Sequence, residues 1–181
     1  MAAYAEFPTS LLTQRLRLRQ WLPSDAEEYH ALWTERDVRS VRSFDAAGRP
    51  TVEEIRGRLL ANPPGAEQGL GLLAVERRDT GGFIGYCGLI VGQGSHDEPE
   101  IAYELAQRAH GNGYATEAGW VVVEAAARTG RQRLWATVRE WNTASFRVLE
   151  KLDFYHSGRV TPDPDRGDSI WMTRELDQPL A

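Results

Sequence analysis

The sequence predicts an α+β fold, with a mixed but mostly antiparallel central sheet flanked by about four helices. Two observations carry this prediction. The chain has 181 residues, of which 41% are hydrophobic and 26% are charged, and this length and composition are typical of one globular domain. Its apolar residues repeat with period two in some segments and with helical spacing in others, in the order β-α-α-β-β-β-α-β-α-β-β. The late helices join strands that can run parallel.

A strand and a helix open the chain. Arg15 to Arg19 alternates arginine with leucine, which predicts an edge strand with both leucines on one face and the arginines on a solvated face. Ser24 and Glu27 have the spacing of a capping box, and they precede a helix expected over Ala26 to Arg36.

A second helix and a hairpin follow. Thr51 and Glu54 again have capping-box spacing, and Pro63-Pro64-Gly65 ends the helix that they begin. Leu70 to Glu76 and Phe83 to Val91 are rich in strand-forming residues and are joined by a short loop that contains two glycines. This pattern predicts an antiparallel hairpin.

Strands and two further helices make up the rest of the chain. On the strand expected over Glu98 to Ala106, one face is apolar and the other carries Glu100 and Glu104. We expect helices at 114–128 and 142–151, and strands at 134–139, 154–160 and 169–175.

Composition excludes several classes of function. The formal net charge is −5 and the sequence pI is near 5.4, so the field of the whole molecule repels nucleic acids and anionic membranes. Cys87 is the single cysteine and the four histidines are far apart, which argues against a disulfide and a zinc site. No basic segment with a long apolar run begins the chain, so we expect an untargeted, cytoplasmic protein.

A glycine-rich segment at positions 107–118 lies between a predicted strand and a predicted helix. The first amides of a helix have no internal partner and the helix dipole is positive there. Gly111 and Gly113 let an anion such as a diphosphate approach the backbone closely. On spacing alone such a loop is also a common tight turn, because it matches neither Gly-x-Gly-x-x-Gly nor a Walker loop.

Together with other motifs, this loop makes the chain resemble the GNAT superfamily of acyl-CoA-dependent N-acyltransferases, and within it the RimJ/RimL-like branch. The resemblance covers nearly the whole chain and implies a single GNAT-like domain over residues 1–181, with acetyl-CoA as cosubstrate and no metal. Apart from the loop, the motifs that carry it are Thr13 to Arg19, Asp25 to Glu27, Phe83 to Leu89, Glu100 to Tyr103, and Asn142-Thr143-Ala144-Ser145.

The loop fits the family's Gln/Arg-x-x-Gly-x-Gly/Ala pattern in two registers. One begins at Arg108 and uses Gly111 and Gly113, and the other begins at His110 and uses Gly113 and Ala115. We favour the second register, because it places the following Ala-Thr-Glu-Ala in the first helical turn, as in the RimJ/RimL-like branch. It puts a histidine where the family often has Gln, Arg or Trp.

The resemblance also implies the contacts of acetyl-CoA. Backbone groups of Tyr103, Glu104 and Leu105 should bind the pantetheine arm, and Asn142 should reach it from the other side, although Asn142 can equally be a simple helix cap. The pyrophosphate should lie on the loop and the first helical turn, formed by His110, Gly111, Asn112, Gly113, Tyr114, Ala115 and Thr116.

Acyl transfer to an amine needs a base for the ammonium proton and an acid for the leaving thiolate. Glu100 is the candidate base, with Glu104 and Glu98 as rivals, and each can also be an ordinary solvated residue. Many family members carry a tyrosine seven residues after the conserved asparagine, but this chain has Leu149 there. Ser145 is the substitute proton donor and cofactor contact, unless its hydroxyl only caps a helix.

Two further residues, Cys87 and Asp153, carry separate predictions. Cys87 lies among apolar strand residues, so we interpret it as a core residue and not as an acyl-carrying nucleophile. Asp153 replaces the glycine usual in the family's Lys-Leu-Gly-Phe turn, which predicts a positive φ for an aspartate.

These expectations define an acetyl-CoA-dependent N-acetyltransferase that acts by direct transfer in a ternary complex. The alternatives are a catalytically weak acyl-CoA or small-ligand binding protein on the same fold, and an unrelated α+β protein with an anion-binding turn. The acceptor is a primary amine, either a protein N-terminus or a small molecule, and a homodimer is possible.

The acceptor site is expected in the region after the first strand and in a late loop, Val38 to Thr51 and Pro162 to Asp168. Acidic residues there can attract a cationic amine, but arginines share the first of these regions. The residues concerned are Asp45, Asp163, Asp165, Asp168, Arg39, Arg42 and Arg49.

Overall fold

The computed structural model describes residues 4–37, 39, 50–61, 64 and 69–176. Its strands are β1 (Ser10–Leu12), β2 (Leu16–Arg19), β3 (Leu72–Arg77), β4 (Phe83–Ile90), β5 (Glu100–Leu105), β6 (Arg133–Arg139), β7 (Tyr155–Thr161) and β8 (Ser169–Glu175). Its helices are α1 (Ala26–Glu35), α2 (Val52–Ala61), α3 (Tyr114–Arg128) and α4 (Thr143–Lys151), and short 3-10 helices cover Pro23–Asp25 and Gln107–Ala109.

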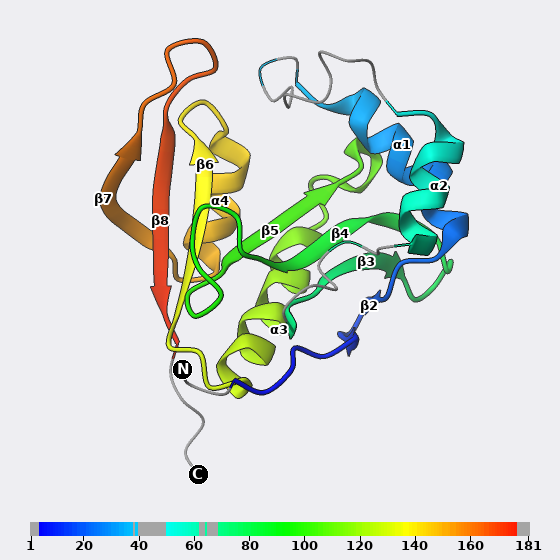
Figure 1. The fold of residues 1–181 in the computed structure, drawn as a ribbon, viewed down its shortest axis with the longest axis horizontal. Coiled ribbons are helices and arrows are strands. Elements are labelled where there is room, and N and C mark those ends of the chain that lie inside the picture. The colour runs from blue at the N-terminus through cyan, green and yellow to red at the C-terminus, as the bar shows by residue number, and fades with distance from the viewer. Residues whose placement is uncertain (1–3, 38, 40–49, 62–63, 65–68, 177–181) are drawn as a thin grey trace.

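These strands form one sheet in the order β1-β2-β3-β4-β5-β6-β8-β7 (Figure 1). Neighbouring strands are antiparallel except β5 and β6, which run parallel. A parallel neighbour requires a crossover connection, and α3 provides it. The predicted α+β fold, with a mostly antiparallel mixed sheet and four α-helices in the described chain, is confirmed.

Apolar side chains pack on both faces of the sheet, because successive strand residues point to opposite faces. On one face, α3 and α4 bury a large core that includes Val122, Leu149 and Ile101 of β5. On the other face, α1 and α2 bury a smaller core that is rich in aromatic rings, and Ala102 of β5 packs against it. The strand β5 is therefore covered from two sides by different layers.

Several local predictions are confirmed. The leucines of the alternating segment, Leu16 and Leu18, are fully buried on one face of β2. At the start of α2 the Thr51 hydroxyl accepts from the Glu54 amide at 3.2 Å, and the Glu54 carboxylate accepts from the Thr51 amide at 2.7 Å. Asp153 has a φ of 58°, as the glycine it replaces would allow.

Other local predictions are wrong. The strand β2 is not at the edge of the sheet, because β1 pairs with its outer side. Its arginine face is not simply solvated, since Arg19 is mostly buried in a bond to the Asp25 carboxylate at 2.7 Å. That carboxylate also accepts from the Leu22 amide, and Asp25, not Ser24, is the N-cap of α1. The helix α2 ends at Ala61, and positions 63 and 65 of the proline-glycine stop lie outside the described residues.

Candidate active site

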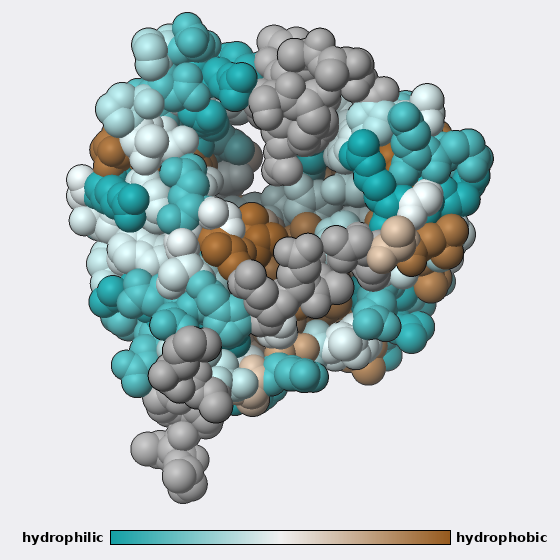
Figure 2. Space-filling model, in the orientation of Figure 1, coloured by the Kyte–Doolittle hydropathy of each residue, from teal (hydrophilic) through white to brown (hydrophobic). Residues whose placement is uncertain are grey.

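The strands β5 and β6 separate almost as soon as they meet. Their only register pair is Glu100 with Trp135, although β5 stays paired with β4 from end to end. Beyond this pair the strands diverge (Figure 1), and the surface is hollowed between the β6–β8 side and the side of α1 and α2 (Figure 2). An extended arm can therefore lie against the free side of β5 and form main-chain hydrogen bonds there.

The glycine loop follows the end of β5. Gly111 and Gly113 have φ values of 76° and 77°, a left-handed conformation that favours glycine, and Gly113 is the N-cap of α3. Within the described chain, the amides at 111–116 donate to no protein acceptor. Because α3 begins at Tyr114, Ala115 to Ala118 lie in its first turns. This loop presents donors and a positive helix end to an anion.

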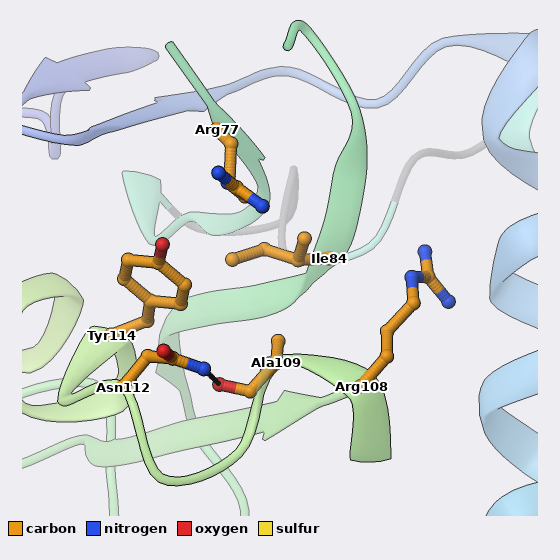
Figure 3. Close-up of a pocket in the computed structure, with 6 residues that line it drawn as sticks. All are labelled: Arg77, Ile84, Arg108, Ala109, Asn112 and Tyr114. Carbon is orange, nitrogen blue, oxygen red and sulfur yellow. Dashed lines mark hydrogen bonds between the residues drawn. The ribbon is translucent and has the colours of Figure 1, made fainter. Parts of the chain in front are cut away.

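Side chains of the loop hold its shape. The His110 Nε2 atom lies 2.8 Å from the Leu105 carbonyl oxygen, so the imidazole fastens the loop to the end of β5. The side-chain Nδ2 group of Asn112 donates to the Ala109 carbonyl at 3.3 Å (Figure 3). It also donates to the His110 carbonyl at 2.9 Å. A histidine at position 110 therefore supports the backbone with its side chain and leaves the loop amides free for a ligand.

Arg15 and Glu117 form hydrogen bonds and an ion pair at the start of α3. Arg15 donates to the Asn112 carbonyl at 3.0 Å, and its guanidinium lies 2.6 Å from a Glu117 carboxylate oxygen. Burial opposes ionisation of Glu117, but hydrogen bonds from Thr13 and Arg15 outweigh it and lower the pKa of this carboxyl. These contacts join the loop and the start of α3 to the turn before β2, and the sequence pattern did not reveal them.

Beside the loop lies a cavity of about 440 Å³, lined by Arg77, Ile84, Arg108, Ala109, Asn112 and Tyr114 (Figure 3). Figure 3 shows Arg77 above the Tyr114 ring, and its guanidinium carbon is 5.9 Å from the ring centroid. Arg108 donates to the Glu28 carboxylate and to the Phe83 carbonyl. The Arg108 side chain therefore ties the loop to α1 and β4.

The first turn of α4 faces the opening from the other side. The Asn142 Oδ1 atom accepts from the Ser145 amide at 3.1 Å, so Asn142 caps α4, while its Nδ2 group has no partner in the described chain. The Ser145 hydroxyl likewise has no protein partner among the described residues. The Tyr103 hydroxyl donates to the Ser145 carbonyl at 3.1 Å, and burial raises the pKa of Tyr103. Leu149 is fully buried and supplies no polar group.

Glu100 is buried and not solvated, with only 4% of the residue exposed. Its Oε2 atom accepts from the Thr137 hydroxyl at 2.7 Å, and its Oε1 atom accepts from the Gln93 amide. Neither donor is charged, and Glu100 has no cation partner in the described chain. A proton can therefore reach this carboxylate without breaking an ion pair.

The two rival carboxylates, those of Glu104 and Glu98, each form an ion pair with an arginine. Glu104 forms a bidentate ion pair with Arg36, in which the Arg36 Nε atom lies 2.6 Å from the Glu104 Oε1 atom. The Glu104 carboxylate also accepts a hydrogen bond from the Tyr86 hydroxyl at 2.8 Å. Glu98 accepts from the Trp135 indole at 2.9 Å and pairs with Arg133 at 3.2 Å. Of these three carboxylates, Glu100 is the one that has no cation partner in the described chain.

The expected acceptor region is described only in part. Positions 38 and 40–49, including Asp45, Arg42 and Arg49, lie outside the described residues. In the late loop Asp163 pairs with Arg139 at 2.8 Å, and the Asp168 carboxylate accepts from the Asp163 amide. The carboxylates of Asp163 and Asp168 therefore form contacts that stabilise the late loop.

Other kinds of chemistry find no support in the described residues. No group of three or more His, Cys, Asp or Glu side chains there is arranged to hold a metal ion. Cys87 is fully buried, and this burial raises its thiol pKa to about 12, so it is not a nucleophilic thiolate. None of the described helices has the length and apolar character needed to span a bilayer.

Comparison with known proteins shows to which family this chain belongs. The family model described as the acetyltransferase (GNAT) domain matches residues 15–155. The chain belongs to the GNAT acetyltransferase family. As a member of this family it is an acetyltransferase that uses acetyl-CoA as cosubstrate, which confirms the expected enzyme class.

Individual relatives agree with this family. An uncharacterized protein of Bacillus subtilis, YkkB, is 33% identical over 156 residues, which are 84% of this chain and 88% of the relative. The uncharacterized N-acetyltransferase YoaA of the same organism is 31% identical over 150 residues, which are 82% of this chain and 84% of the relative.

Among solved structures, RimL, an L7/L12 α-N-protein acetyltransferase in complex with coenzyme A, superposes with a TM-score of 0.76. It is 17% identical and the match covers 97% of this chain and 100% of RimL. The fold is thus that of RimJ/RimL-like GNAT acetyltransferases.

Proposed function

We propose that this GNAT chain works as one acyl-CoA N-acyltransferase domain, which transfers an acetyl group from acetyl-CoA to a primary amine by direct transfer in a ternary complex. The acceptor is a protein N-terminus or a small-molecule amine. One observation carries the proposal: β5 and β6 separate directly after Glu100, between the unpaired loop amides and the free polar groups of α4. Cosubstrate and amine can meet in this opening from opposite faces of the sheet.

The residues present fit acetyl-CoA. A Cβ built on Gly111 meets no atom within 4 Å, so the loop is open on that side, and unpartnered amides suit a pyrophosphate. Backbone groups of Tyr103 and Leu105 would bind the pantetheine arm along the free side of β5, whereas the backbone groups of Glu104 face β4. Asn142 would donate to the same arm through Nδ2. When bound, acetyl-CoA supplies a thioester carbonyl that an amine can attack.

The chain contributes a base and an acid to the reaction. Glu100 accepts the proton of the ammonium group, which frees the nitrogen lone pair for attack on the carbonyl carbon. The Ser145 hydroxyl donates a proton to the sulfur as the carbon–sulfur bond breaks, and it takes up the second proton that the nitrogen releases, so the serine hydroxyl is restored. Its lack of a protein partner in the described chain supports this role, because no existing hydrogen bond has to be given up.

Acetyl-CoA binding measured by calorimetry tests the site. We expect micromolar affinity, and Gly113→Glu should weaken it at least about tenfold, because a carboxylate at the helix N-cap repels the pyrophosphate. Gly158→Glu is the matched control, since Gly158 also has a left-handed φ, of 82°, and open space around it but lies on β7. Equal weakening by both substitutions would place the cosubstrate elsewhere.

Turnover separates an enzyme from a binding protein. Purified protein is incubated with acetyl-CoA and panels of small amines, peptides with free N-termini and drug-like amines, and acetylated products are identified by mass spectrometry. Acetylated product that depends on Ser145 or Glu100 supports the proposal. Tight binding without product from any panel would favour the weakly catalytic binding protein that the absent tyrosine at position 149 suggests.

A further inference from the structure

Because Glu100 is buried, a proton can reach its carboxylate only along a path between neighbouring side chains. The carboxylate is covered on one side by the loop after β4, where the Gln93 amide donates to Oε1. Gly92 packs so closely here that a Cβ on it would lie 2.5 Å from Oε1. An acceptor amine therefore cannot approach Oε1 while this loop is in place, which leaves Oε2 as the atom that can receive a proton.

The side chain that contacts Oε2 is Thr137 on β6. Its hydroxyl donates to Oε2 at 2.7 Å, and Thr137 itself is half-buried. It stands two residues after Trp135, the last residue of β6 that pairs with β5, and so it is the first residue on its face beyond the point where the strands part. Thr137 thus joins the buried carboxylate to the opening.

We propose that the Thr137 hydroxyl relays the proton of the acceptor ammonium to Glu100. The inference rests on the proposed function, in which Glu100 is the base. The ammonium nitrogen gives a proton to a lone pair of Oγ1 while the proton already on Oγ1 passes to Oε2. The products are a neutral amine, an unchanged threonine hydroxyl and a neutral carboxylic acid. The nitrogen lone pair then forms the new bond to the carbonyl carbon.

The surroundings favour this direction of transfer. A hydroxyl has one proton to donate and two lone pairs to accept, so Thr137 can hold Oε2 and an ammonium group at once. The carboxylate has no cation partner in the described chain, unlike Glu98 and Glu104, and protonating it breaks no ion pair. Two donors also fix the orientation of the carboxylate, which keeps Oε2 directed at Thr137.

Substitutions at position 137 test the relay. Thr137→Val keeps the shape but removes the hydroxyl, and Thr137→Ser keeps the hydroxyl. With a tripeptide amide or benzylamine as acceptor at pH 8, we expect Thr137→Val to lower kcat at least about tenfold and Thr137→Ser to stay within about threefold of the unmodified protein. Acetyl-CoA affinity, measured by calorimetry, should not change in either variant.

Hydroxylamine distinguishes a relay from a structural role. This acceptor is already uncharged at pH 8, so Thr137→Val should acetylate it at a nearly unchanged rate. Equal losses with hydroxylamine and with the basic amines would overturn the relay. Thr173→Val is the control for a lost hydroxyl, because Thr173 lies on the adjacent β8 and donates only to the Leu134 carbonyl.

Glu100→Gln separates this inference from the function on which it rests. If Glu100→Gln lowers kcat with the basic amines and Thr137→Val does not, the relay is wrong and the base assignment stands. If Glu100→Gln has no effect, both are wrong. An unmodified protein that acetylates none of these amines would overturn the transferase proposal itself and the relay with it.

Discussion

Among single residues, Glu117 has the clearest electrostatic role. It lies in the first turn of α3, accepts from the Thr13 hydroxyl at 2.5 Å and pairs with Arg15 at 2.6 Å. Arg15 in turn donates to the carbonyl of Asn112 in the glycine loop. Glu117 therefore connects the turn before β2 to the loop expected to hold the pyrophosphate.

Acid should weaken this connection. The folded pKa of Glu117 is lowered, so its contribution to stability is fully present above its unfolded pKa of about 4.3 and is lost as the pH falls through the folded pKa. Glu117→Gln should be less stable than the unmodified protein near pH 7, and this difference should shrink as the pH falls below about 4.3. Urea denaturation at several pH values measures this, and a constant difference between the two proteins would contradict it.

Between elements, the end of α1 is bonded both to β5 and to the start of the glycine loop. Arg36 pairs with Glu104 of β5, and the Glu35 carboxylate accepts from the Gln107 amide at 2.7 Å. Burial alone would lower the pKa of Arg36, but the bond to Glu104 outweighs it and raises that pKa. These contacts hold α1 against β5 and against the start of the glycine loop.

Removing one partner of this ion pair should destabilise the fold more than removing both. Arg36→Met leaves the Glu104 carboxylate without its cation and should lower the free energy of unfolding by about 3 kcal/mol. Adding Glu104→Gln should recover more than half of that loss. Arg128→Met, which breaks only the exposed pair with Glu124, should change it by less than about 0.5 kcal/mol. Urea denaturation measures all three, and additive losses would contradict the coupling.

For the whole molecule, the decisive feature is that strand pairing is brief at the middle of the sheet. The β1–β5 part and the β6–β8 part share one register pair, and the Tyr103 hydroxyl adds a bond to α4 across the opening. A cosubstrate that lies between the two parts would contact both. Binding should therefore stabilise the folded molecule as a unit.

Acetyl-CoA should raise the free energy of unfolding in proportion to the logarithm of its concentration. At one hundred times its dissociation constant the expected increase is about 2.7 kcal/mol. The same concentration should have much less effect on Gly113→Glu, whose affinity is reduced. Urea denaturation with and without acetyl-CoA provides the measurement, and an equal increase in both proteins would contradict the site.

Much of the fold was predictable because it depends on local patterns. Period-two alternation located β2, capping-box spacing located the start of α2, and glycine placement marked the loop before α3. The family resemblance added the enzyme class, which the comparisons confirm. The contacts of acetyl-CoA and the roles of Glu100 and Ser145 stay predictions. The capping box at Ser24 was wrong because the Asp25 carboxylate binds Arg19 and the Leu22 amide instead.

The sequence by itself determined the order of the elements apart from β1, which it missed, the position of the glycine loop before α3 and the side of β5 that carries carboxylates. Only the tertiary structure decided which carboxylate has which partner. The Thr137–Glu100, Arg36–Glu104 and Arg15–Glu117 contacts join residues that are 37, 68 and 102 positions apart. The period of a strand or a helix describes neighbours within one element. Contacts between distant elements depend on how the chain packs, and they distinguish Glu100, a buried carboxylate without a cation partner in the described chain, from two carboxylates held in ion pairs.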